Sequence, residues 1–117
     1  MTPILIAMAL LAADPLPAAD VCKTEFIDMP TGASVADYYP VTAIAEKVTG
    51  ETEIDCIVAE DLKLGKCIVT EEVPEGYGFG VATIKLAMRK ARGVAVDGNG
   101  TSCVGRHVRF RFHWVFS

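Results

Sequence analysis

The stretch Val104–Phe116, VGRHVRFRFHWVF, alternates between apolar and basic side chains and lies near the C-terminus. The even positions from 108 onward are apolar: Val108, Phe110, Phe112, Trp114 and Phe116. The odd positions are polar and mostly basic: His107, Arg109, Arg111 and His113. A β-strand sends alternate side chains to opposite faces, so the stretch predicts one long strand with an apolar and a basic face. We expect the other elements to bury their apolar surface against this strand.

The composition predicts one folded domain. The chain has 117 residues, of which 51% are hydrophobic and 22% are charged, which suits a single core and does not indicate disorder. The net charge of −4 argues against a general nucleic-acid binder, despite the basic face of the last strand.

The first twenty residues differ from the rest of the chain. An apolar run covers Pro3–Ala13, and it is shorter than the roughly 20 residues that span a membrane. Pro15, Pro17, Ala18 and Ala19 follow this run, and the more polar part of the chain begins at Asp20. This layout predicts a secretory signal peptide over residues 1–19, export from the cytoplasm and no stable membrane insertion. Thr2 is the only polar residue before the run, so a mis-assigned start codon or a loose apolar tail is the alternative.

Four cysteines in a small exported domain suggest disulfides, and four allow three pairings. Their spacing contains no Cys-x-x-Cys and does not suit zinc. The segment 51–70 has the pattern of a β-hairpin, with Ile54, Cys56 and Val58 on one face of its first strand. Gly65, Cys67 and Val69 share a face of its second strand.

One hairpin register satisfies the apolar pattern and the cysteines together. It pairs Cys56 with Cys67, which sets Ile54 opposite Val69 and Val58 opposite Gly65. Asp61-Leu62 then forms a two-residue turn, in which Leu62 needs a positive φ that costs about 1 kcal/mol or more. A wider loop is the alternative. The register predicts a Cys56–Cys67 disulfide and leaves Cys22 and Cys103 either paired or free.

Two helices are expected. After an irregular lead-in over residues 20–36, Pro40 suits the start of a helix that Gly50 ends. The apolar stripe of this first helix comprises Val41, Ile44, Ala45 and Val48. The second helix covers Val81–Ala91, with a buried stripe of Val81, Ile84, Ala87, Met88 and Ala91 and with Lys85 and Arg89 outside. Asp97–Gly100 reads as a turn before the last strand. The simplest fold is α+β, a three-stranded antiparallel sheet with two helices packed on one face.

The order of these motifs resembles the C-terminal domain of the TonB family. Tyr39-Pro40 opens a helix, the hairpin follows Gly50, Gly78-Phe79-Gly80 leads an Ala-rich helix, and Asp97-Gly98 precedes the terminal strand. The resemblance covers residues 37–117. It implies a periplasmic domain that binds a short segment of an outer-membrane transport receptor as an added strand. The sequence shows no membrane-length anchor and no Pro-rich spacer, so we expect partner binding without force transmission by this chain itself.

The residues indicate the same mode of binding independently. An unpaired sheet edge offers N–H and C=O groups to an extended peptide, and the last strand is long. We expect the contact along this strand, at Arg106, His107, Arg109, Arg111 and His113, with the arginines favouring acidic peptides. The alternative is a stand-alone structural or accessory periplasmic protein.

No pattern in the sequence indicates catalysis. His107 and His113 share a face but lie about 20 Å apart on an extended strand, so they do not share a metal ion. The loop Pro74–Gly80 has alternating glycines without a following Lys-Ser/Thr, which does not fit a phosphate-binding loop. We therefore expect neither an enzyme nor a cofactor.

Overall fold

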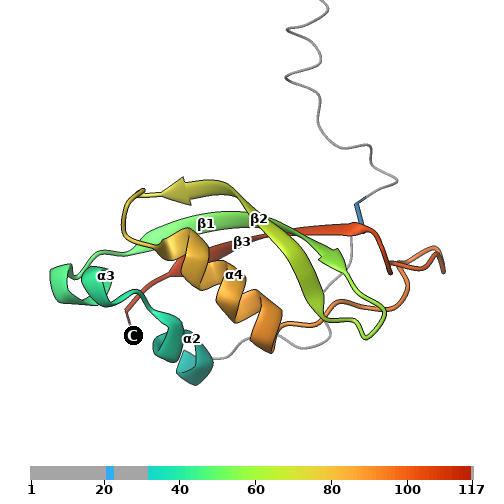
Figure 1. Cartoon of the computed structure of the whole chain (residues 1–117), viewed down its shortest axis with the longest axis horizontal. Helices are drawn as coiled ribbons and strands as arrows, with labels where there is room; N and C mark the ends of the chain where they lie inside the picture. The colour runs from blue at the N-terminus through green and yellow to red at the C-terminus, as the bar shows by residue number, and fades with distance from the viewer. Residues whose placement is uncertain (1–20, 23–31, 117) are drawn as a thin grey trace, which may run out of the picture.

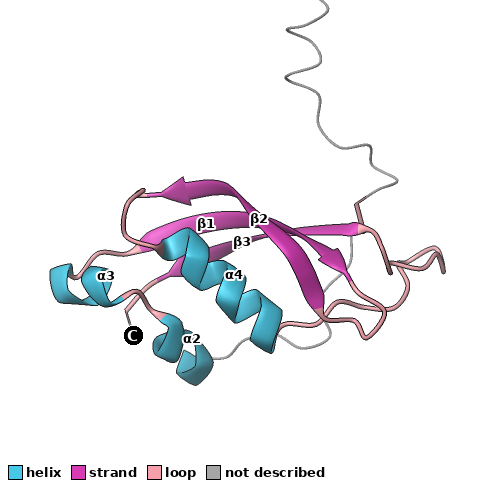
Figure 2. Ribbon diagram, viewed as in Figure 1, coloured by secondary structure: helices cyan, strands magenta, loops and turns pink. Residues whose placement is uncertain are grey.

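The computed structural model describes residues 21–22 and 32–116, which form a small α+β domain (Figures 1 and 2). Its strands are β1 (Gly50–Val58), β2 (Leu64–Val73) and β3 (His107–Trp114), and its helices are α2 (Gly32–Tyr38), α3 (Val41–Glu46) and α4 (Phe79–Lys90). The sheet has the order β2-β1-β3, and β1 is antiparallel to both neighbours. The predicted three-stranded antiparallel sheet is confirmed. The predicted signal peptide, residues 1–19, and most of the lead-in, residues 20–36, lie outside the described residues.

The helices do not form one uniform layer. Helix α4 lies across β1 and β2, α2 packs against α4, and α3 lies near one end of the sheet (Figure 1). The last part of the expected irregular lead-in is helical. Helix α2 begins there, at Gly32. The central strand is β1, so β3 is an edge strand rather than the strand on which the other elements converge.

The buried face of the first expected helix was predicted wrongly, and that of the second was predicted in part. In α3 only Ala43 is buried, whereas Val41 is 81% exposed and Ile44 is 48% exposed. A helix of six residues is too short to present a continuous stripe, and its β-branched residues favour helix weakly. Of the stripe predicted for the second helix, Ala87 and Ala91 are buried and Ile84 is partly buried. Val81 and Met88 are exposed instead, and the buried face extends to Phe79, Ala82, Thr83 and Leu86.

Gly50 opens β1 instead of ending a helix, and α3 ends with Lys47 in the left-handed conformation. A Cβ atom on Gly50 would lie 2.5 Å from the ring of Phe79. The absence of a side chain at residue 50 thus lets this buried aromatic ring pack against the strand backbone. Residue 50 must therefore be glycine because the Phe79 ring lies close to its backbone, and not because a helix ends there.

The apolar face of β3 is confirmed. Val108 and Trp114 are buried on it, Phe110 and Phe112 are half-buried, and the strand ends before Phe116. Trp114 packs edge-on against Tyr39 at 5.4 Å and lies 6.1 Å from the ring of Phe79. This aromatic cluster joins the end of β3 to the start of α4 and to the Tyr39-Pro40 segment.

Both disulfides form, Cys56–Cys67 as predicted and Cys22–Cys103 in addition. Ile54 pairs with Val69 as predicted, but Val58 pairs with Leu64 instead of Gly65, because the ladder shifts register near Cys56. Lys66 has a φ of 49°, which accommodates the extra residue of the bulge. The hairpin loop is wider than two residues, yet Leu62 still adopts a positive φ of 69°.

Candidate binding site on the edge strand

One row of backbone polar groups on β3 points away from β1, toward the edge of the sheet. The N–H of Cys22 donates to the carbonyl of His107 at 2.7 Å, on the side of β3 away from β1. The carbonyl of Arg106 accepts from Val58 on the β1 side at 3.1 Å. Since alternate residues of a strand point their backbone groups to opposite sides, those of Arg109, Arg111 and His113 also point outward.

The chain's own N-terminal segment occupies the beginning of this outer edge. Val21 forms a parallel bridge with His107, and the neighbouring Cys22 is joined to Cys103. Arg106 lies in the turn before β3, donates to the carbonyl of Val21 at 3.0 Å and pairs with Asp97 at 2.9 Å. Hydrogen bonds from Arg106, Thr101 and Asn99 hold the pKa of Asp97 below its ordinary value of 3.8. Arg106 therefore fastens this end of β3 to Val21 and Asp97.

The basic side chains of β3 meet acidic side chains on the neighbouring strands. Asp55 of β1 is only 5% exposed and binds two of them, with Nδ1 of His107 at 2.5 Å and Nε of Arg109 at 2.7 Å. A carboxylate buried to this degree needs such partners, because an unpaired buried charge is costly. His107 and Arg109 are thus partners of Asp55 within the sheet.

Arg111 and His113 are paired in the same way. The guanidinium of Arg111 binds Glu51 at 2.7 Å and also contacts Glu53 and Glu71, and the last contact gives it partners on two strands. Hydrogen bonds to Glu71 and then Glu51 raise the pKa of Arg111 above its ordinary value. His113 lies 3.7 Å from Glu51.

The face of the sheet that carries these pairs is not basic. Four carboxylates, of Glu51, Glu53, Asp55 and Glu71, oppose only two arginines, so with neutral histidines the group carries a net charge of −2. Glu51, Glu53 and Asp55 occupy alternate positions of β1, so the sequence alone places these acids on one face of that strand. Their meeting with β3 depends on the strand order, which the residue pattern alone did not provide. This balance does not support the expected preference for acidic peptides at β3.

An apolar groove continues from the end of β3. It has a volume of about 390 Å³ and is lined by Val35, Ala36, Tyr39, Ile44, Phe112, His113, Val115 and Phe116. Phe116 stacks on Tyr39 with the ring centroids 4.9 Å apart, yet remains 44% exposed. The sequence did not predict this groove, because no helix was expected over most of α2 and the buried face of α3 was assigned wrongly.

The contacts of the glycine loop before α4 explain its residues by local packing and hydrogen bonding. Gly78 has a φ of 85° at the start of α4, and a Cβ on Gly80 would lie 2.8 Å from Val69. The hydroxyl of Tyr77 donates to Glu46 at 2.9 Å, and this hydrogen bond raises the pKa of Tyr77. Within the described ranges, no three His, Cys, Asp or Glu side chains are grouped so that they could hold a metal ion.

No protein-family model matches this sequence, and no curated protein matches it. None of the helices in the described part of the chain is long and apolar enough to cross a membrane.

Proposed function

We propose that this chain binds an extended peptide, which adds as a strand to the outer edge of β3. The observation that carries the proposal is the row of outward backbone groups on Arg109, Arg111 and His113. No described residue forms a backbone hydrogen bond with these groups. An edge of this kind pairs with an added strand through main-chain hydrogen bonds.

The two ends of this edge differ, which supports a defined position for the peptide. Val21 and Cys22 already pair at His107, so the added strand lies beside Arg109–Trp114. At the far end the apolar groove accepts side chains of the added strand that point to the helix side of the sheet. Side chains on the other side meet the paired charges around Arg111. Affinity therefore comes from the backbone and the groove, and charge contributes little.

The partner we propose is a segment of an outer-membrane transport receptor in the periplasm. This choice follows from the resemblance to TonB C-terminal domains and from the export signal expected in residues 1–19. The cysteine pairs Cys22–Cys103 and Cys56–Cys67 support an oxidising compartment, since disulfides persist there and are rare in the cytosol.

The test removes one outward N–H and keeps a matched control. Arg111→Pro and Arg111→Ala both lose the guanidinium, but only the proline variant loses the backbone N–H that points outward. In a titration with outer-membrane receptor peptides followed by backbone NMR, the alanine variant should bind like the wild type. The proline variant should lose binding while its fold persists. Equal binding by both variants, or peptide-induced shifts confined to Gly76–Gly80, would exclude strand addition at β3.

A stand-alone structural or accessory role is the second candidate, and one observation favours it. The chain pairs Val21 with the beginning of its own β3 edge and fastens the neighbouring Cys22 to Cys103. A protein that covers its own edge protects it from association with other strands. A pull-down from outer-membrane extract separates the two roles, since only the binding module retains a receptor, and the Arg111→Pro variant then retains none.

A further inference from the structure

A second surface, on the helix side of the molecule, collects positive charge. A groove of about 780 Å³ runs between α4 and the segment from the end of α2 to the start of α3. Its lining residues are Asp37, Tyr38, Tyr39, Pro40, Val41, Gly78, Val81, Ala82, Lys85, Arg89 and Lys90. Three of these residues are cationic and one, Asp37, is acidic, so the lining carries a net charge of +2 in a chain whose overall charge is −4.

The cations of this groove differ from those of β3. Arg109 and Arg111 are bound to carboxylates of the sheet. By contrast, Lys85, Arg89 and Lys90 have no ion pair with any described residue, and the whole of α4 contains no acidic residue. No residue that the structure describes neutralises their charge through an ion pair.

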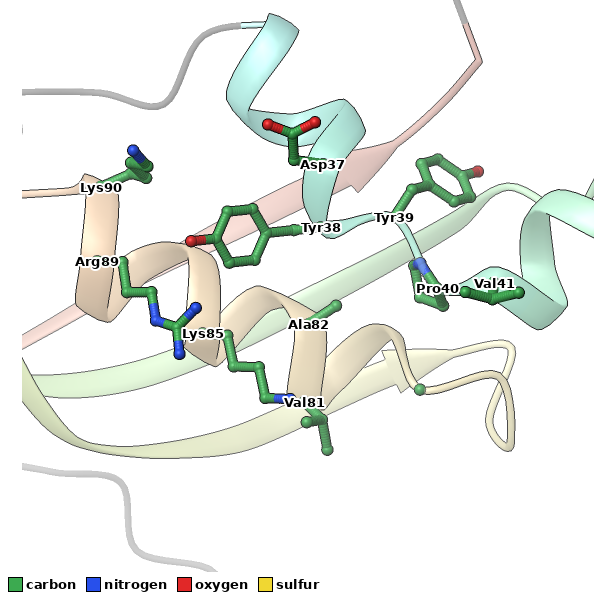
Figure 3. Close-up of a pocket in the computed structure, with 11 residues that line it drawn as sticks. Asp37, Tyr38, Tyr39, Pro40, Val41, Val81, Ala82, Lys85, Arg89 and Lys90 are labelled. Atoms are coloured by element: carbon green, nitrogen blue, oxygen red, sulfur yellow. The ribbon is translucent and has the colours of Figure 1, made fainter.

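The groove also has an aromatic wall. Figure 3 shows the ring of Tyr38 extending from α2 toward α4, with Arg89 and Lys85 on the same side of that helix. The guanidinium carbon of Arg89 lies 5.9 Å from the centroid of the Tyr38 ring, within the range of a cation–π contact. This contact orients Arg89, so one cation of the groove is held in place before any ligand arrives.

Exposed apolar side chains flank the cations. Val41 is 81% exposed and Val81 is 58% exposed, and both line the groove. A site that joins cations with apolar contacts suits a ligand with carboxylates and aliphatic groups along an extended chain. A recessed groove between two elements fits such a chain better than it fits the broad surface of a bilayer.

We propose that this groove binds an acidic peptide segment of a partner protein, with its carboxylates on Lys85 and Arg89 and its apolar side chains against Val41 and Val81. The site is separate from the β3 edge and does not depend on strand addition there. Because the pairs would be exposed, their strength should fall as salt screens them over about 8–10 Å.

The test uses a fluorescein-labelled peptide, ELEGELE, and its neutral counterpart, QLQGQLQ, in anisotropy titrations at low and physiological salt. The double variant Lys85→Gln, Arg89→Gln removes two groove cations. The control Lys63→Gln, Arg92→Gln removes one lysine and one arginine outside the groove. We expect ELEGELE to bind the wild type and the control equally, and the groove variant to bind about fivefold to tenfold more weakly, as two exposed ion pairs allow.

Backbone NMR locates the peptide independently of affinity. Shifts induced by ELEGELE along α2 and α4 support the groove, whereas shifts along β3 place the peptide on the sheet edge and overturn the proposal. Equal binding of QLQGQLQ, an equal loss in the control variant, or no binding of ELEGELE would also overturn it. So would a groove variant that loses co-sedimentation with phosphatidylglycerol vesicles while ELEGELE does not bind, because the groove would then serve a lipid surface.

Discussion

The hydroxyl of Thr83 joins three elements at the centre of the aromatic cluster. It donates to the carbonyl of Phe79 at 2.7 Å and accepts from the indole N–H of Trp114 at 2.8 Å. The hydroxyl oxygen of Thr52 in β1 lies 2.6 Å from that of Thr83. Because the single hydroxyl proton of Thr83 is donated to Phe79, Thr52 is the donor in this hydrogen bond. All three side chains are fully buried, so each of these bonds replaces one to water.

We expect Thr83→Val to destabilise the fold by about 1–3 kcal/mol, because it leaves the buried N–H of Trp114 without an acceptor. Thr83→Ser keeps the hydroxyl and should cost less. Chemical denaturation followed by the fluorescence of Trp114, the only tryptophan, measures both variants. Serine and valine variants of equal stability would show that the hydroxyl contributes nothing here.

At this scale the sequence predicted the tryptophan and missed its partners. Trp114 lies on the apolar side of a strict alternation, so its burial follows from the pattern. Thr52 continues the alternation of Ile54, Cys56 and Val58 and could have been placed on the same face. Thr83 could not, because a threonine within a helix is read as an outward polar residue until its buried acceptor and donors are known.

Among the elements, the contact between β1 and α4 depends on the missing side chain of Gly50. We expect Gly50→Ala to destabilise the fold by about 1–3 kcal/mol, since its Cβ would lie 2.5 Å from the buried ring of Phe79. Gly65→Ala in β2 is the matched control, because nothing lies within 4 Å of the added Cβ. Its effect should stay within about 0.5 kcal/mol. Thermal melts compare the two, and similar melting temperatures would contradict the close packing at Gly50.

The strands were more predictable than the helices. Side chains of a strand alternate between its two faces, and a short segment is enough to show this period of two. The apolar face of β3 and the facing cysteines of the hairpin could therefore be predicted. Helix α2 begins with Gly-Ala-Ser and α3 has six residues, so neither has a periodic stripe long enough to recognise. The ion pairs of Asp55 and Arg111 were missed for a different reason, since they require knowing that β1 lies beside β3.

For the whole molecule, the two disulfides should contribute unequally. Cys22–Cys103 spans a sequence separation of 81 and Cys56–Cys67 spans 11. In the chain-entropy model these loops stabilise the fold by about 4.5 and about 3 kcal/mol, because the longer loop restricts the unfolded chain more. Urea unfolding of Cys22→Ala, Cys103→Ala and of Cys56→Ala, Cys67→Ala measures the difference. A larger loss in the hairpin variant would contradict the entropic account.

The Cys22–Cys103 bond also determines where a mechanical pull on Val21 would enter the domain. A pull applied at Val21 passes through this covalent bond to Cys103 and enters β3 within a few residues. Strand β3 is laddered to β1 from Gly50 to Ile57, so tension along the strand axis is shared by those hydrogen bonds together. The covalent path bypasses residues 23–102, and the helices and the hairpin loop lie to one side of it. A pull between Val21 and the far end of β3 would therefore place β3 under tension.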